Sequence, residues 1–155
     1  MSALSDRLQA DLTTAMKQRD EVRTAALRMA LAALSTEQTS GKVARELTDD
    51  EVVTVLGREV KKRREAAEAF ESAGRADSAA RERAEQDVLA EYLPAALSDG
   101  ELDALVAEAV AQAQASGASG KGAMGAVMKL LQPQVRGRAD GAEVARRVRA
   151  ALGLG

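Results

Sequence analysis

The sequence predicts an all-α, multihelical fold, and three observations support that prediction. Hydrophobic residues make up 46% of the chain, yet it contains one Phe, one Tyr and no Trp, so its core rests on Ala, Leu and Val. Such a composition suits closely packed helices better than sheets, which favour β-branched and aromatic residues. Apolar residues recur at helical spacings of three, four and seven, and no segment shows the alternation expected of a strand.

We expect two domains, an N-terminal four-helix scaffold over residues 1–94 and a small C-terminal three-helix domain over residues 97–155. The first helix, over residues 4–19, is predicted from apolar residues on one face, namely Leu4, Leu8, Leu12, Ala15 and Met16. The second, over residues 21–38, directs inward Leu27, Ala30, Leu31 and Leu34. The breaker Thr39-Ser40-Gly41 ends it.

The third and fourth helices are predicted from their end signals. The third, over residues 49–72, opens with the capping box Thr48-Asp-Asp-Glu51 and ends at Gly74. We expect Asp77 or Ser78 to cap the fourth helix, which continues to about Tyr92. The pair Leu93-Pro94 closes this half of the chain.

Three helices are expected after Pro94. The first opens with the capping box Ser98-Asp-Gly-Glu101 and carries the apolar residues Leu102, Leu105, Val106, Ala109, Val110 and Ala113. After the flexible stretch 115–120, a shorter helix buries Met124, Val127, Met128 and Leu131, and Pro133 is expected to stop it. A turn Arg136-Gly137-Arg138 leads to the last helix. Asp140 caps this helix with Glu143 as a capping-box variant, and Val144, Val148 and Leu152 face inward.

Composition excludes several kinds of chemistry. The chain has no Cys and no His, so it lacks disulfides, a thiolate nucleophile, Cys-based zinc sites and the commonest general base. Paired carboxylates such as Glu65/Glu68 lie at caps or on charged helical faces and carry no signal for acid–base catalysis. We therefore expect no catalytic residue, no metal and no cofactor.

Nothing in the sequence indicates export or membrane insertion. Charged Asp6 and Arg7 stand where a signal peptide would need an apolar run. No uncharged apolar stretch approaches the ~20 residues of a membrane span. We expect a soluble, cytoplasmic protein.

The segment Gly120-Lys-Gly-Ala-Met-Gly125 matches the pattern G-x-G-x-x-G. That motif binds dinucleotides when a strand precedes it, whereas an Ala-rich helix and a Ser/Gly loop precede it here. Glycines at a helix start can still present N–H groups to a phosphate. A plain loop and helix entry is the simpler interpretation.

A basic cluster, Lys61-Lys-Arg-Arg64, lies within the third helix. The spacings Glu59–Arg63, Lys61–Glu65 and Arg64–Glu68 predict ion pairs on a solvated face. Arg63, however, falls on the centre of the apolar stripe, so we expect it to pair with Glu82 or Glu85 of the next helix or to contact a ligand. The second candidate patch for nucleic acid is Lys61, Arg63, Arg64 and Arg75.

The C-terminal segment is strongly basic. From Lys121 onward there are seven Lys/Arg and two Asp/Glu, whereas the preceding residues hold fifteen and twenty-two. The candidate phosphate contacts are Lys121, Lys129, Arg136, Arg138, Arg146 and Arg149, with Gly137 and Gly141 shaping the turn. The near absence of aromatic side chains argues against base stacking and favours structured RNA recognised by backbone and shape. A protein-binding surface is the alternative interpretation.

Two sets of motifs resemble known families. The run Met124-Gly-x-Val-Met128, then Pro133-x-Val-Arg-Gly-Arg-Ala-Asp-Gly141 and a short basic helix, resembles the tail domain of the B subunit of tRNA-dependent amidotransferases. Upstream, Lys61-x-Arg-Arg-Glu-Ala and Glu91-Tyr-Leu-Pro94 are similar to the N-terminal half of the stand-alone YqeY-like family. The resemblance covers nearly the whole chain, and it implies an all-α, two-part architecture with a role in tRNA binding.

The family is often described as a carbon–nitrogen ligase with glutamine as amido-N-donor. Such chemistry needs a glutaminase centre and a nucleotide-dependent activation step, and this chain shows no Cys, no Ser–Lys amidase signature and no nucleotide site. We therefore predict a tRNA-binding accessory protein without a catalytic centre of its own. The alternative is a helical interaction module that docks on amidotransferase subunits or another acidic partner.

Overall fold

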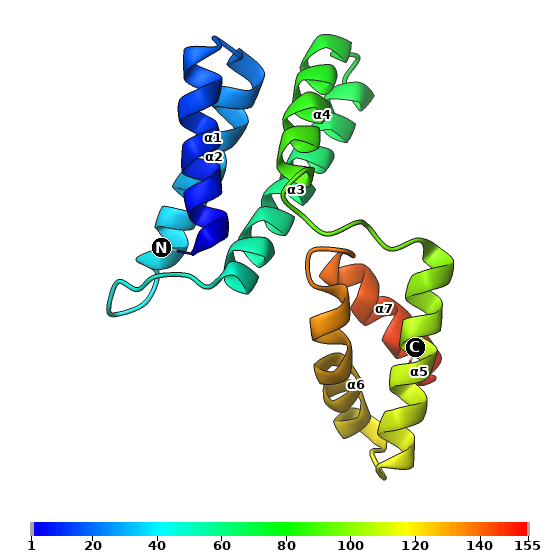
Figure 1. Cartoon of the computed structure of the whole chain (residues 1–155). Helices are drawn as coiled ribbons and strands as arrows, with labels where there is room; N and C mark the ends of the chain where they lie inside the picture. Colours follow the sequence, from blue (N-terminus) through cyan, green and yellow to red (C-terminus); the bar gives the residue numbers. More distant parts are fainter. Residues whose placement is uncertain (1, 155) are drawn as a thin grey trace. The chain divides into compact units, whose positions relative to one another are not determined.

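The computed structural model describes residues 2–154, except for the side chain of Lys121. Within that range the chain forms seven α-helices and no strand, which confirms the predicted all-α class (Figure 1). The helices are α1 (Ala3–Lys17), α2 (Glu21–Gln38), α3 (Asp49–Ser72), α4 (Ala76–Ala90), α5 (Asp99–Ala115), α6 (Gly120–Val135) and α7 (Gly141–Ala151). The chain divides between Leu93 and Pro94 into two compact units, which we call unit 1 and unit 2.

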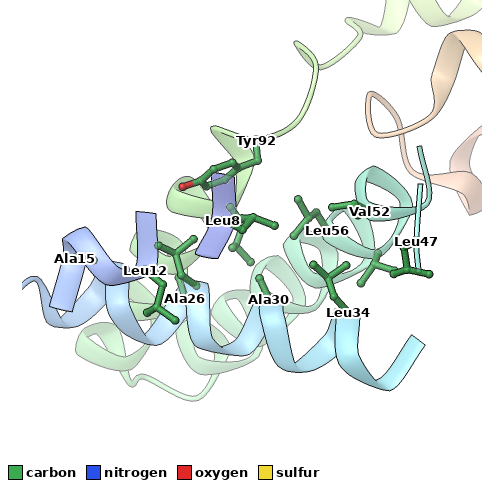
Figure 2. Packing of buried hydrophobic residues seen from close by; sticks show 13 residues of the cluster. Leu8, Leu12, Ala15, Ala26, Ala30, Leu34, Leu47, Val52, Leu56 and Tyr92 are labelled. Atoms are coloured by element: carbon green, nitrogen blue, oxygen red, sulfur yellow. The ribbon is translucent and has the colours of Figure 1, made fainter. Parts of the chain in front are cut away.

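The core of unit 1 is built from small and branched aliphatic side chains. One leucine from each of its four helices is fully buried, and these are Leu8, Leu27, Leu56 and Leu89. Figure 2 shows side chains from α1, α2 and the first turns of α3 gathered in this cluster together with Tyr92. Each buried leucine contributes about 2 kcal/mol to stability, and the alanines between them let the helices approach closely.

The predicted inward residues of α1 and α2 are buried, or partly buried against the core in the case of Leu4 and Leu31, with one exception. Leu8, Leu12 and Ala15 of α1 are buried, as are Leu27 and Ala30 of α2. Met16 was expected inside but is 49% exposed. Ala15 occupies the inward position in the last turn of α1, so its neighbour Met16, about 100° further round the helix, is turned toward solvent.

The start of α3 is fixed by the predicted capping box. The Thr48 hydroxyl accepts from the Glu51 N–H at 3.2 Å, and the Glu51 carboxylate accepts from the Thr48 N–H at 2.8 Å. The same carboxylate pairs with Arg45 at 2.9 Å. Buried Leu47 anchors the preceding loop in the core. These contacts together determine where the long connection from α2 ends.

Tyr92 ties the end of α4 to α1. Its hydroxyl donates a hydrogen bond to the Asp11 carboxylate, and the Arg7 guanidinium lies 4.6 Å from the centre of its ring. Burial, reinforced by the bond to Asp11, raises the pKa of the Tyr92 hydroxyl to about 12. The hydroxyl therefore remains a donor at neutral pH, and the contact holds the last residues of unit 1 on its core.

The turn between α3 and α4 differs from the prediction. Gly74 adopts a left-handed conformation with φ of 74°, and the N–H of Arg75 bonds to the Phe70 carbonyl at 2.8 Å. This tight turn lets α4 begin at once at Ala76, with Arg75 as the N-cap residue and no side-chain cap. The expected cap at Asp77 or Ser78 is therefore wrong. Asp77 lies in the first turn of α4, where its negative charge interacts favourably with the helix dipole.

Charged side chains line the seam between α3 and α4. Arg63 faces inward and its Nε lies 3.5 Å from Oε2 of Glu82, which confirms one of the two partners expected. The expected Glu59–Arg63 pair is wrong, because buried Glu59 pairs with Lys62 at 3.0 Å instead. Arg63 Nη1 also lies 2.9 Å from the sulfur of Met29 on α2. The seam thus joins three helices through one half-buried cation.

Unit 2 is a three-helix unit with its own core. The predicted capping box at Ser98 and Glu101 is confirmed. The fully buried aliphatic side chains come from α6 and α7, and they are Val127, Leu131, Val144 and Val148. Met124, Met128 and Leu152 were expected inside and are only partly buried against this core. The hydrophobic faces of α5, α6 and α7 therefore close on one another.

One predicted helix end in unit 2 is wrong, and the predicted Asp140 cap of α7 is confirmed without its capping box. Pro133 does not stop α6 but lies inside it, two residues before the end. The ring removes the N–H that would bond the Lys129 carbonyl, and both residues lie on the exposed side, where water can satisfy that carbonyl. At the start of α7, Asp140 accepts from the Ala142 N–H at 3.4 Å as a cap, but Glu143 binds arginines instead of completing a capping box.

None of the helices in the described part of the chain is long and apolar enough to span a membrane.

The Arg63–Glu82 pair can be tested by removing one or both charges. We predict that Glu82→Ala lowers the free energy of unfolding by about 3 kcal/mol, because Arg63 remains in the seam without its acid. The double variant Arg63→Met/Glu82→Leu should lie within about 1 kcal/mol of wild type. Tyr92 is the only tyrosine and belongs to unit 1, so its fluorescence during urea unfolding reports this unit selectively. Exposed Glu68→Ala is the control, and equal losses in Glu82→Ala and Glu68→Ala would contradict this role.

The α3 capping box predicts a defined pH dependence. Hydrogen bonds from Arg45, and then from the Thr48 N–H, lower the pKa of the Glu51 carboxyl from 4.5 to about 2. Because the folded pKa lies below the unfolded one, this stabilisation is complete above pH 4.5 and is lost as the pH falls toward 2. NMR titration of the folded protein should show the Thr48 amide shifting with a midpoint near pH 2, and Glu51→Gln should abolish the shift. A midpoint near 4.5 would show that Arg45 does not hold the carboxylate.

Candidate nucleic-acid interface

The turn between α6 and α7 depends on one glycine. Arg136 has φ of −55° and ψ of 121°, Gly137 has φ of 70°, and the Arg138 N–H bonds to the Val135 carbonyl at 2.8 Å. This is a type II turn, which requires a residue that tolerates positive φ at its third position. Gly137 therefore shapes the turn as predicted, and it places half-buried Arg136 between the two helices.

Arg138 serves the fold of unit 2. Its Nε donates to the Ala95 carbonyl at 2.9 Å, and its own carbonyl accepts from the Leu97 N–H at 2.9 Å. A weaker contact of 3.5 Å joins Nη1 to the Gln134 carbonyl at the end of α6. The guanidinium thus fastens the entering segment 94–97 to the turn, and a phosphate would have to compete with these carbonyls.

Arg147 was not singled out by the sequence, yet it is the most heavily paired cation of unit 2. Its guanidinium lies 2.6 Å from Asp99, 2.7 Å from Asp103 and 2.9 Å from Glu143. The hydrogen bonds that Arg147 donates, first to Glu143 and then to Asp103, raise the pKa of this already basic group. The cluster joins the start of α5 to α7. A helical wheel offered a signal, since Arg147 lies about 60° from the buried position of Val144.

Arg146 and Arg149 both lie on the exposed side of α7, as predicted. Arg146 is held by Glu143, with Nη2 at 2.5 Å from Oε1 and Nε at 3.1 Å from Oε2. Arg149 makes no side-chain hydrogen bond or ion pair with any described residue. The two arginines therefore differ in how readily a ligand can reach their charge.

Among the described side chains, the outer side of α6 carries a further exposed cation. Lys129 is exposed opposite the buried stripe and pairs with no described acid. Gly122 and Gly125 are exposed on the same side, and a Cβ at either would meet nothing within 4 Å. A glycine within a helix costs about 1 kcal/mol relative to alanine. The described packing of unit 2 does not require glycine at either position.

The sequence also predicted a phosphate contact at Lys121 and a turn-shaping role for Gly141. Lys121 lies outside the described side chains. Gly141 is exposed at the first position of α7, with ordinary φ and open space around its Cα, so the turn geometry does not require glycine there.

The sequence predicted a large difference in net charge between the basic C-terminal segment and the rest of the chain. This difference is smaller when the charged residues are counted over each compact unit. Unit 2 contains seven Lys/Arg but also six acids, which are Asp99, Glu101, Asp103, Glu108, Asp140 and Glu143. The acidic start of α5 folds against α7 and neutralises Arg147. A positive surface on unit 2 must therefore come from the few cations that these acids do not hold.

The second candidate patch is not brought together on one face. Arg63 points into the α3–α4 seam, whereas Arg64 is exposed and has no described partner. Arg75 lies at the turn between α3 and α4, where its guanidinium stacks on the Phe70 ring, 5.0 Å from the ring centre. Lys61 is half-buried on α3. The inward position of Arg63 therefore separates it from exposed Arg64 and Arg75.

The described side chains of unit 2 provide charges and hydrogen-bond donors. No group of three or more acidic side chains among the described residues is arranged to hold a metal ion. The exposed Lys129 and Arg149 of this unit hold no described acid and can pair with an anion.

Comparison with known proteins supports the resemblance seen in the motifs. The model of a family described as Yqey-like protein matches residues 5–152, which is nearly the whole chain. No curated protein matches the chain.

The two glycines of the turn should respond differently to alanine. Gly137→Ala forces an L-residue into positive φ and should destabilise unit 2 by about 1 kcal/mol. Gly141→Ala is the matched control and should be neutral or stabilising by up to about 1 kcal/mol, because alanine lowers the entropy of the unfolded chain. Hydrogen exchange of the Val144 and Val148 amides measures both. Equal effects would remove the conformational role of Gly137.

Proposed function

The chain belongs to the YqeY-like family, and from that premise we propose that unit 2 binds tRNA as an accessory protein without a catalytic centre of its own. The observation that carries this proposal is the pair of exposed, unpaired cations Lys129 and Arg149. They lie on α6 and α7, the two helices whose motifs resemble the tail of the amidotransferase B subunit.

The contact would be made to the sugar–phosphate backbone. Lys129 and Arg149 can each neutralise a phosphate without breaking an internal ion pair, which keeps the energetic cost of binding low. Gly122 and Gly125 leave the α6 backbone open beside Lys129, so a strand could approach closely. Gly141 gives the same freedom at the start of α7. The only aromatic residues, Phe70 and Tyr92, belong to unit 1, so unit 2 would read shape and charge and would not stack on bases.

We propose that fewer residues contact tRNA directly than the sequence led us to expect. Arg138 would act mainly as a positioning residue, because its guanidinium holds the Ala95 carbonyl. Arg146 would contribute only in part, because Glu143 holds it. Among the residues whose side chains the structure describes, Lys129 and Arg149 would therefore contribute most of the electrostatic attraction to tRNA.

Filter binding of purified protein to total tRNA over a salt series tests the proposal. We expect Lys129→Ala/Arg149→Ala to make the log–log salt slope shallower by about two, one for each lost phosphate contact. Lys17→Ala/Arg28→Ala is the matched control, because both residues are exposed, unpaired cations of unit 1, and it should leave the slope unchanged. Absence of tRNA binding at low salt would overturn the proposal. It would favour the alternative of a module that docks on amidotransferase subunits.

A further inference from the structure

We infer that Glu143 limits the affinity of unit 2 for polyanions by masking Arg146, and that it thereby sets how many cations α7 offers to RNA. The inference rests on the proposed function and specifies how that same surface is restrained. Glu143 lies one turn before Arg146 on α7, and the two side chains form a bidentate ion pair. Arg146 Nη2 lies 2.5 Å from Oε1 of Glu143, and Arg146 Nε lies 3.1 Å from Oε2.

The pair is accessible to a ligand. The side chain of Arg146 is 69% exposed and that of Glu143 is 31% exposed, so a phosphate can reach the guanidinium only beside a carboxylate of the same sign as itself. Glu143 also keeps its charge over a wide pH range, because hydrogen bonds from Arg146 and then Arg147 lower its pKa. The acid therefore opposes every polyanion that approaches this side of α7.

Removing the Glu143 charge should release Arg146 alone. Arg147 also contacts Glu143, but it keeps Asp99 at 2.6 Å and Asp103 at 2.7 Å. Arg147 would therefore stay engaged with the start of α5 and continue to hold α7 in place. The variant should therefore gain one cation that can contact a phosphate, and the slope of a salt series measures that number.

Such masking would favour a ligand that engages the whole surface. An RNA that also meets Lys129 on α6 can tolerate the Glu143 repulsion better than a polyanion that touches only α7. A repulsive element of this kind raises specificity by weakening unwanted complexes more than the intended one.

The experiment measures tRNA binding of the full chain with Glu143→Gln over a salt series. We expect about fivefold tighter binding near 0.1 M salt and a log–log slope steeper by about one. The double variant Glu143→Gln/Arg146→Ala should lose that gain, because the released cation is then absent. The charge control is Glu108→Gln, since Glu108 is an exposed acid of α5 with no described partner. It should leave the slope unchanged.

Each outcome decides the inference. An unchanged or shallower slope in Glu143→Gln overturns it, as does an equal gain in Glu108→Gln, which would reveal only an effect of net charge. A merely structural role of Glu143 would lower the folded fraction and weaken binding without making the slope steeper. If wild-type protein and all variants fail to bind tRNA, the proposed function is overturned and the inference with it. If tRNA binds but Glu143→Gln changes nothing, only the inference fails.

Discussion

Internal pairing of the arginines is the constraint on which the rest of unit 2 depends. Arg147 joins α7 to the acidic start of α5, and Arg138 fastens the entering segment to the turn after α6. Both contacts use charge for folding, in a unit whose core is made mainly of Val, Leu and Ala. Under the proposed function, the ligand of unit 2 would meet cations that these folding contacts do not engage, such as Lys129 and Arg149.

Unit 1 also has a core of mainly small and aliphatic side chains, and it too uses charged side chains to hold its helices together. Its core has one aromatic residue, Tyr92, and several alanines, so the helices supplement hydrophobic contact with charged side chains. Arg63 and Glu82 lie in a half-buried seam, where their attraction has to offset the cost of removing both charges from water. At the other end of α4, the Tyr92 hydroxyl is held by Asp11. Charged residues in this protein thus act largely as structural links between helices.

Local signals allowed much of the fold to be predicted. The two capping boxes at Thr48 and Ser98 have complete sequence signatures, and both occur as expected. Errors arose where a local rule met a tighter turn or an exposed position. The Gly74 turn starts α4 before Asp77 can cap it, and Pro133 is tolerated because the Lys129 carbonyl faces water.

The candidate site was less predictable, because charge pairing depends on residues distant in sequence. Arg147 lies 44 and 48 residues from Asp103 and Asp99, and no periodicity within α7 reveals those partners. A count of charges beginning at Lys121 indicated a strongly basic segment, whereas the folded unit includes the acids of α5. The sequence could identify the turn and Lys129, but only the packing of α7 on α5 shows which arginines are engaged.

The central claim is that tRNA meets the unpaired cations of unit 2 and leaves the paired ones in place. NMR of the arginine Nε–H groups during titration with tRNA tests it directly. The account predicts that the Arg149 signal shifts with added tRNA while the Arg147 signal stays where it is in the free protein. A shift of Arg147 with an unchanged Arg149 signal would contradict it.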